Sequence, residues 1–218
     1  MAILNYAPPM WPYLDIVFKD EHFLVLNKPS GLLSVPGKGL AHQDSLQLRV
    51  ARVYPTATIV HRLDMATSGL LVMALNKAAH RHISKQFELR QTRKTYIAIV
   101  YGQVTKETGC VDLPLICDWP NRPKQMVCQQ SGKAAQTLWR VLARNSSHTR
   151  LELTPVTGRS HQLRVHMLSL GHPILGDRLY AHPQALKMAA RLQLHAQSLS
   201  FTHPCCEQPV SFFAPCAF

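Results

Sequence analysis

The sequence predicts an α+β fold, and three observations lead to it. Segments with the apolar pattern of β-strands are mixed with segments whose apolar residues recur at helical spacing. The helical segments do not follow each strand in the regular alternation that builds a parallel sheet. Neighbouring predicted strands are joined by short polar turns, which are typical of antiparallel pairs.

The first third of the chain is predicted to contain two short strands, a loop and a helix. Apolar residues favour strands at 15–18 and 23–26, joined by a polar turn. Glycine and proline then break the pattern across residues 28–39, which predicts a loop. Asp44 is placed to cap a helix that runs to about Val53.

The next segment alternates between strand and helix. A short extended piece at 57–60 leads to a strand at 70–75, which is apolar throughout and therefore predicted to be buried. Asn76 can cap a helix over 77–89, because apolar residues recur there at four-residue spacing: Ala79, Ile83 and Phe87. A further strand is predicted at 95–100.

The second half is predicted to contain a hairpin, a helix and two final strands. Residues 138–142 and 150–153 have the pattern of an antiparallel pair around the polar turn 145–147. Ser160 is expected to cap a helix whose inward face is apolar, made of Leu163, Met167 and Leu170. From Leu192 onward the pattern predicts two strands separated by a His-Pro dipeptide.

The charge of the chain points to a polyanionic partner. Lys and Arg total 24 against 12 Asp and Glu, a net charge of +12. Neutralising phosphates releases condensed counterions, so this surplus favours nucleic acid over a charge used only for solubility. Hydrophobic residues make up 46% of the chain, which excludes global disorder. No apolar run approaches the roughly 20 residues of a membrane helix, and no signal peptide is visible, so we expect a cytoplasmic protein.

The six cysteines are expected to be free thiols. None of them forms a Cys-x-x-Cys pair, and nothing in the sequence indicates an oxidising compartment. The open alternative is a zinc site, whose candidate ligands are His203, Cys205, Cys206 and Cys216. Adjacent cysteines chelate a single ion poorly, which disfavours this site.

The first segment that contains candidate catalytic residues is 61–69, His-Arg-Leu-Asp-Met-Ala-Thr-Ser-Gly. Its acid, Asp64, is predicted to lie on a loop between two apolar pieces, where scaffolds present reactive groups. The alternative is an ordinary turn-forming aspartate that binds its own backbone. A protein-kinase catalytic loop is excluded, because Leu63 displaces the acid by one residue and neither a Gly-rich loop nor an Asp-Phe-Gly motif is present.

The second segment is residues 158–166, Gly-Arg-Ser-His-Gln-Leu-Arg-Val-His. A helix from Ser160 would place His161 and Arg164 on one polar side. A buried arginine needs a carboxylate partner, for which Asp64 is a candidate; a solvated face or a phosphate contact is the alternative. The five-residue spacing of the two histidines does not suit a metal pair on one helix face.

These segments resemble the RluA family of pseudouridine synthases. The matching stretches lie in the family's order, at residues 28–31, 61–64 with 67–69, 158–166 and 194–196. Residues 112–124 are similar to a small branch that modifies both tRNA and large-subunit rRNA. The resemblance implies the family's catalytic fold, with a central, mixed but mainly antiparallel sheet, flanking helices and an RNA-binding cleft. It also implies a single catalytic domain over 1–218, without the N-terminal S4-type domain of larger members.

The resemblance assigns roles to individual residues. Asp64 matches the nucleophile that detaches uracil from ribose, so that the base can turn and rejoin through C5. Arg164 matches the arginine that stabilises this carboxylate, and Tyr96 matches the tyrosine that stacks on the extracted base. Leu194 matches an apolar residue that packs against the base; without the family it would be read as core.

Contacts with the substrate are expected from basic residues. The target uridine must leave its stack, and we expect Arg62 to fill the vacated space or to hold a phosphate, with an ion pair inside the loop as the alternative. Lys28 is expected to approach the RNA backbone, or else to be a solvated loop lysine. A basic stretch is suited to further phosphate contacts, and it comprises His80, Arg81, His82, Lys85, Arg90, Arg93 and Lys94.

The resemblance therefore predicts an isomerase that forms pseudouridine in structured RNA and needs neither metal nor cofactor. Its expected substrates are tRNA anticodon stem-loops at position 32 and 23S rRNA at position 746, and a monomer suffices for one flipped base. A non-catalytic RNA-binding or chaperone module on the same fold is the second hypothesis. A metal-dependent hydrolase is the third, although it rests only on the 12 histidines.

Overall fold

The computed structural model describes residues 6–218, which divide into two compact units. Among the described residues, the N-terminal unit consists of 6–94 together with Ala196–Ala217. The central unit consists of Thr95–His195 with Phe218. The boundaries fall inside two strands, β5 (Arg93–Tyr101) and β11 (Leu194–Thr202), so each of these strands contributes residues to both units.

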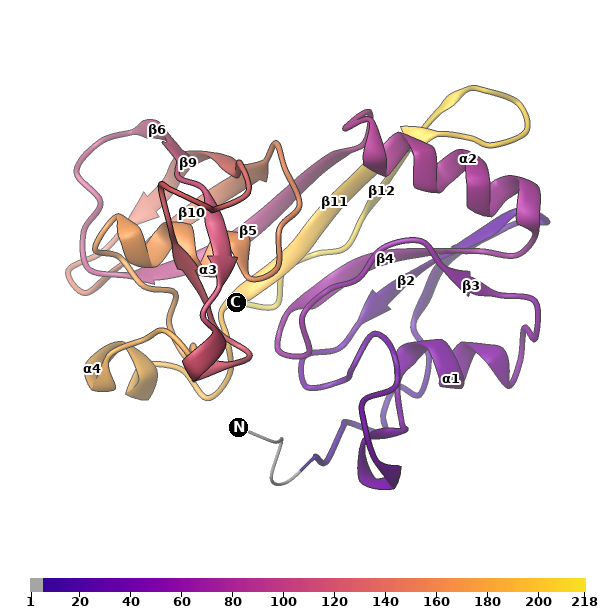
Figure 1. Ribbon diagram of the computed structural model, residues 1–218, viewed down its shortest axis with the longest axis horizontal. Coiled ribbons are helices and arrows are strands. Elements are labelled where there is room, and N and C mark those ends of the chain that lie inside the picture. The colour runs from indigo at the N-terminus through magenta and orange to yellow at the C-terminus, as the bar shows by residue number, and fades with distance from the viewer. Residues whose placement is uncertain (1–5) are drawn as a thin grey trace. The chain divides into compact units, whose positions relative to one another are not determined.

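The sheet of the N-terminal unit has the strand order β1-β2-β4-β11 (Figure 1). A short strand, β3, pairs with β4, and β12 pairs with β11. The remaining bounds are β1 Ile16–Lys19, β2 Phe23–Lys28, β3 Thr58–Ile59, β4 Ser68–Ala74 and β12 Pro209–Phe213. The pairings β1–β2, β2–β4, β3–β4 and β11–β12 are all antiparallel. Every residue of β4 is buried, as its continuous apolar sequence predicts.

Three helical segments complete the N-terminal unit: η1 (Leu40–His42), α1 (Leu46–Ala51) and α2 (Lys77–Glu88). Asn76 caps α2 as predicted, because its side chain accepts the Ala79 N–H at 2.9 Å. The predicted cap of α1 is wrong by one residue. Ser45 accepts the Leu48 N–H, whereas the Asp44 carboxylate binds Arg49.

Gly69 is required by close packing inside the N-terminal unit. Gly69 lies within β4 and has a φ of +113°. A Cβ atom at this position would lie 2.3 Å from the Ala196 carbonyl oxygen. Only glycine tolerates both the positive φ and this approach of two backbones.

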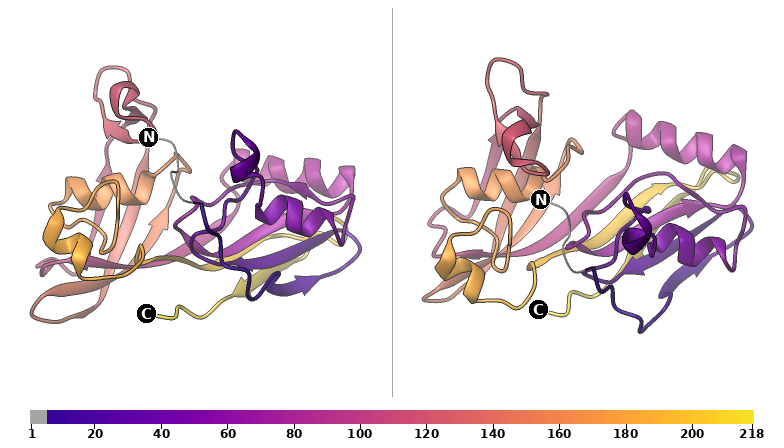
Figure 2. Two further views of the ribbon diagram at one scale, coloured as in Figure 1. Left: turned by 90° about the horizontal axis from the view of Figure 1, so that it is seen from below. Right: turned by 60° about the horizontal axis from the view of Figure 1, so that its bottom comes forward.

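The main sheet of the central unit has the strand order β5-β10-β9-β6. Its further strands are β6 Thr108–Asp112, β9 Gln136–Arg144 and β10 His148–Pro155. The predicted hairpin is confirmed, since β9 and β10 pair antiparallel and Asn145 Oδ1 accepts the N–H groups of Ser147 and His148 in the turn. A second, two-stranded sheet stands out from this unit (Figure 2), formed by β7 Leu115–Cys117 and β8 Gln125–Val127 around η2 Trp119–Asn121.

Helix α3 (Gln162–Ser169) packs against β8, β9 and β10, and the short α4 (Pro183–Lys187) follows it. The predicted cap at Ser160 is wrong. His161 occupies the N-cap position with a left-handed φ of 54° and makes no capping bond. The buried Gln162 side chain instead accepts the Arg159 N–H (3.0 Å) and the Thr157 hydroxyl (2.7 Å), which anchors the start of the helix. Within residues 6–218 no helix has the length and apolarity needed to cross a bilayer.

Candidate active site

Asp64 lies in the loop that joins β3 to β4, as predicted. The residue before it is held by one side chain: the Ser34 hydroxyl donates to the Leu63 carbonyl (2.6 Å) and accepts the Leu63 N–H (3.1 Å). The loop also closes on itself, because the Thr67 N–H donates to the Asp64 carbonyl at 3.1 Å. Asp64 itself is half-buried. The loop therefore holds the backbone around Asp64 in place and leaves its carboxylate partly accessible.

Lys28 is completely buried, and the expectation of a solvated loop lysine is wrong. Its ammonium donates to the carbonyls of Pro29 (2.9 Å), Leu32 (2.8 Å) and Met65 (3.0 Å). Burial lowers the pKa of Lys28 to about 7, while the negative charge of Asp64 acts in the opposite direction. Lys28 therefore joins two loops and stabilises Asp64 from below the surface. An ammonium with three carbonyl partners would have to break these bonds to reach an RNA phosphate.

His61 fixes the start of the same loop. Its Nε2 accepts the Val72 N–H from β4 at 3.1 Å, so this nitrogen carries no proton. Its ring stacks on Phe87 of α2, with 4.4 Å between centroids. Burial lowers the pKa of His61 to about 3, and the charge of Lys94 acts in the same direction. His61 is therefore a neutral structural residue at neutral pH.

The expected RNA-contacting residues of the N-terminal unit differ in exposure. Arg62 is exposed beside Asp64, which leaves its predicted role open. In the basic stretch, exposed side chains belong to Arg81, Lys85, Arg90 and Arg93. Lys94 is half-buried, and its Nζ lies over the Phe87 ring, 5.5 Å from the ring centroid.

Arg164 is buried in α3, at 5% side-chain exposure, and is bound by a carboxylate that the sequence did not reveal. Its Nε donates to Asp177 Oδ2 (2.7 Å) and its Nη2 to Asp177 Oδ1 (2.6 Å), a bidentate pair. Asp177 is fixed in turn, because Oδ1 accepts the Leu179 N–H at 2.9 Å. The solvated-face alternative for Arg164 is therefore wrong. The pairing of Arg164 with Asp64 stays a prediction.

Tyr180 links the polar side of α3 into one network. Its hydroxyl lies 2.7 Å from His161 Nδ1, and its ring lies 5.0 Å from the Arg164 guanidinium. His161 and Arg164 thus share a side of the helix as predicted, but that side faces Tyr180 and Asp177. His166 points elsewhere: it is buried between the Thr137 hydroxyl (2.9 Å) and the Leu113 carbonyl (3.0 Å), and burial lowers its pKa.

Asp177 and Tyr180 are the polar neighbours of Arg164 that the sequence reasoning missed. A signal was available, since Asp177 follows a glycine at the end of an apolar stretch and the chain has only 12 acidic residues to neutralise a buried arginine. The other two expected site residues of the central unit lie on strands. Tyr96 is half-buried on β5, opposite Leu153 of β10, and Leu194 begins β11 at 3% exposure.

The six cysteines, all within residues 6–218, are free thiols as predicted. The zinc hypothesis gains no support from its central histidine. His203 Nε2 binds Asp20 at 2.8 Å, and Nδ1 accepts the N–H groups of Cys205 and Cys206. In the part of the chain that the structure describes, no group of three or more His, Cys, Asp or Glu is placed to hold a metal ion.

Residues 22–169 match the family model described as RNA pseudouridylate synthase. The chain belongs to this family. It is 57% identical to the "Dual-specificity RNA pseudouridine synthase RluA" of Salmonella typhimurium over 219 aligned positions, covering 100% of both chains. The protein of the same name from Escherichia coli strain K12 is 56% identical over the same length.

A solved structure shows the same fold. The human "RNA Pseudouridylate Synthase Domain Containing 1" superposes with a TM-score of 0.79 at 29% identity, covering 93% of this chain and 83% of the human chain. The predicted fold class, α+β with a mainly antiparallel sheet, is confirmed. The protein is an RNA pseudouridine synthase, an isomerase that converts uridine to pseudouridine in RNA. A purely RNA-binding module and a metal-dependent hydrolase are both set aside by this result.

Proposed function

We propose that this pseudouridine synthase acts on both tRNA and 23S rRNA, in line with the dual specificity that the names of its relatives state. The specific targets we propose are position 32 of tRNA anticodon stem-loops and position 746 of 23S rRNA. Full-length identity of 57% to a dual-specificity enzyme supports this substrate range. We further propose that residues 1–218 act as a single catalytic domain, as a monomer, in the cytoplasm.

The proposed nucleophile is Asp64, and the observation that carries this assignment is its fixed loop. Hydrogen bonds hold the backbone before it at Leu63 and after it at Met65, while Asp64 itself is only half-buried. A carboxylate held in this way is oriented before substrate arrives, so that little freedom is lost in the reaction.

The isomerisation breaks the C1′–N1 bond and forms a C1′–C5 bond, with one proton lost from C5 and one gained at N1. In the proposal Asp64 assists the first step, Tyr96 stacks on the detached base, and Leu194 packs against it. Arg164, oriented by Asp177, stabilises the negative charge of the site. Arg62 occupies the space that the flipped uridine leaves or binds a neighbouring phosphate.

Substitution of Asp64 tests the assignment. Asp64→Asn keeps the shape of the side chain but removes its charge, so pseudouridine formation should vanish while RNA binding persists. Turnover is measured by pseudouridine mapping of tRNA and 23S rRNA, and binding by filter retention. Asp15→Asn is the control, because Asp15 is a half-buried aspartate of the same unit that binds Asn27 at 3.0 Å. A folded Asp64→Asn protein that still isomerises uridine would disprove the role of Asp64.

A further inference from the structure

Ser34 is buried, at 3% exposure, and its hydroxyl both donates to and accepts from Leu63, the residue before Asp64. Its hydroxyl proton goes to the Leu63 carbonyl at 2.6 Å, and its oxygen accepts the Leu63 N–H at 3.1 Å. We propose that Ser34 is a positioning residue for the reaction, acting through the backbone of Leu63 on the direction of the Asp64 carboxylate. This inference rests on the proposed role of Asp64 as nucleophile.

The geometry explains why one hydroxyl can have this effect. The Leu63 carbonyl belongs to the peptide group that joins Leu63 to Asp64, and a peptide group is planar. Holding its oxygen therefore also holds the Asp64 nitrogen. The second bond, to the Leu63 N–H, fixes the peptide group before it. With both planes fixed, the nitrogen and Cα of Asp64 are fixed as well. The Thr67 N–H, which donates to the Asp64 carbonyl at 3.1 Å, holds the peptide group that follows, so the Cα–Cβ bond of Asp64 has little freedom to turn.

The other side of Asp64 is fixed by different donors. The Met65 carbonyl accepts the Gly31 N–H at 2.8 Å, and the Ala66 carbonyl accepts the Ser30 hydroxyl at 2.7 Å. Loss of the Ser34 hydroxyl would therefore leave the loop attached after Asp64 but loosened before it. We therefore expect the Asp64 carboxylate to be misdirected while the loop stays folded.

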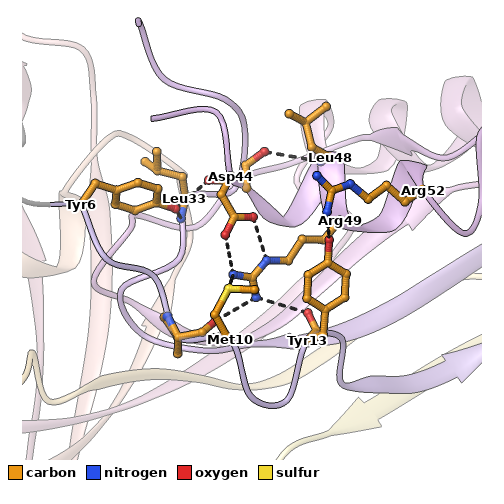
Figure 3. A network of polar contacts seen from close by, with 10 residues as sticks. Tyr6, Met10, Tyr13, Leu33, Asp44, Leu48, Arg49 and Arg52 are labelled. Carbon is orange, nitrogen blue, oxygen red and sulfur yellow. Dashed lines mark hydrogen bonds and ion pairs between the residues drawn. The ribbon is translucent and has the colours of Figure 1, made fainter. Parts of the chain in front are cut away.

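Ser34 can hold Leu63 only because its own backbone is anchored to α1 and to the N-terminal segment. The Ser34 and Leu33 carbonyls accept N–H groups from the first turn of α1, at 3.2 and 2.8 Å. The Leu33 N–H donates to the Tyr6 hydroxyl (2.9 Å), and that hydroxyl donates to the Asp44 carbonyl (2.7 Å) (Figure 3).

Arg49 holds the N-terminal segment and α1 together. Its guanidinium is fully buried and donates twice to the Asp44 carboxylate, at 2.8 and 2.6 Å (Figure 3). It also donates to the carbonyls of Pro9 (2.9 Å) and Tyr13 (3.3 Å), which holds the N-terminal segment against α1. These contacts are costly to break, because the loss of any one of them would leave a buried charge or a buried carbonyl without its partner.

The test compares Ser34→Ala with a matched variant elsewhere. Thr149 in the central unit has the same bonding pattern: it is buried, its hydroxyl donates to the Gly102 carbonyl (2.8 Å) and it accepts the Val104 N–H (3.0 Å). Thr149→Val removes this hydroxyl without touching the loop of Asp64. Both proteins are characterised by urea unfolding, RNA dissociation constant and single-turnover rate at saturating stem-loop RNA.

We expect Ser34→Ala to lower the single-turnover rate by about 10- to 100-fold, the range that a small misplacement of a reacting group causes. The RNA dissociation constant should stay within about twofold of the wild-type value, and the Leu63 amide should exchange its hydrogen faster in NMR. Thr149→Val should keep the wild-type rate at a comparable loss of stability.

Three results would overturn the inference: a wild-type rate in Ser34→Ala, unchanged exchange at the Leu63 amide, or an equal rate loss in Thr149→Val. If Ser34→Ala does not fold, Tyr6→Phe serves instead. It removes the acceptor of the Leu33 N–H and should lower the rate by a smaller factor, so that a wild-type rate there is equally decisive. Failure of the nucleophile assignment is distinguishable, because in that case Asp64→Asn itself would retain activity.

Discussion

At the scale of single residues, the polar groups of the site are held by partners that are themselves fixed. Arg164 has both Asp177 oxygens, at 2.6 and 2.7 Å, and Asp177 has backbone N–H partners in the following turn. Lys28 has three carbonyl acceptors. In each case the charge is buried and hydrogen-bonded, which is the condition under which such groups are tolerated.

The Arg164–Asp177 pair gives a prediction about stability. Arg164→Met should lower the free energy of unfolding by about 3–5 kcal/mol, because it leaves the Asp177 carboxylate buried without its cation. Adding Asp177→Asn should recover part of this loss, since the amide removes the unpaired charge and can still accept the Leu179 N–H. Urea unfolding of both proteins measures the difference. If the double variant is less stable than Arg164→Met alone, the pair is not the source of the loss.

The sequence led to Arg164 but not to Asp177, and the reason is physical. Spacing on a helix shows which side chains share a face, so His161 and Arg164 could be grouped from sequence alone. The acid that meets Arg164 lies on a separate turn 13 residues away, and the glycine before Asp177 marks a turn without showing which cation the acid binds. Lys28 shows a similar limit, since a lysine beside Pro and Gly usually marks an exposed loop.

At the scale of elements, side-chain contacts attach the loop of Asp64 to β4, to α2 and to the loop that follows β2. His61 connects it to β4 through the Val72 N–H and to α2 through the Phe87 ring. Ser34 and Lys28 connect it to the loop that follows β2. The long elements around it follow the sequence pattern closely, because their apolar runs are buried in the sheet.

The buried His61 makes this attachment sensitive to acid. Well above the ordinary histidine pKa of about 6.5, the imidazole is neutral in both the folded and the unfolded chain and adds no pH dependence. As the pH falls toward 3, the unfolded chain binds the proton first, so the folded state loses up to about 1.4 kcal/mol per pH unit. His61→Gln, whose amide oxygen can accept the Val72 N–H, should show a flatter decline between pH 6.5 and 4.5 in urea unfolding. Equal slopes would contradict a neutral buried His61.

Elements that the sequence did not predict are short and carry little apolar pattern. Strands β7 and β8 have three residues each and α4 has five, too few for a period to be recognised. The helix starts were displaced for another reason. Asp44 and Ser160 are good caps by residue type. The Asp44 carboxylate, however, accepts hydrogen bonds from Arg49, and at the start of α3 the Gln162 side chain accepts the Arg159 N–H in place of a Ser160 cap.

At the scale of the whole molecule, the charge of +12 is the main source of RNA affinity in our account. Exposed arginine and lysine side chains on and after α2 are suited to phosphates, namely Arg81, Lys85, Arg90 and Arg93. Selectivity must then come from the shape of the RNA loop and from a few unstacked bases, because proteins cannot read the narrow major groove of an RNA helix.

This account predicts how the enzyme responds to salt and to RNA size. Affinity should fall by on the order of 0.7 log units per log unit of salt for each single-strand phosphate contacted. A minimal stem-loop with the target uridine should be modified nearly as well as whole tRNA. The same sequence in a perfect duplex should be a poor substrate, because flipping then costs pairing as well as stacking. An inert stem-loop beside an active full-length tRNA would mean that recognition depends on tertiary structure.

The division of the chain into its two units has a consequence for synthesis on the ribosome. Apart from Phe218, the described part of the central unit is one continuous stretch, Thr95–His195, whereas the N-terminal unit is completed only by Ala196–Ala217. Although its first strands are made before the central unit, this unit must wait for β11 and β12, most of whose residues emerge after the central unit. Until then Gly69 lacks the Ala196 backbone that packs against it. The N-terminal unit is thus begun before the central unit and completed after it, so its sheet closes later on the ribosome.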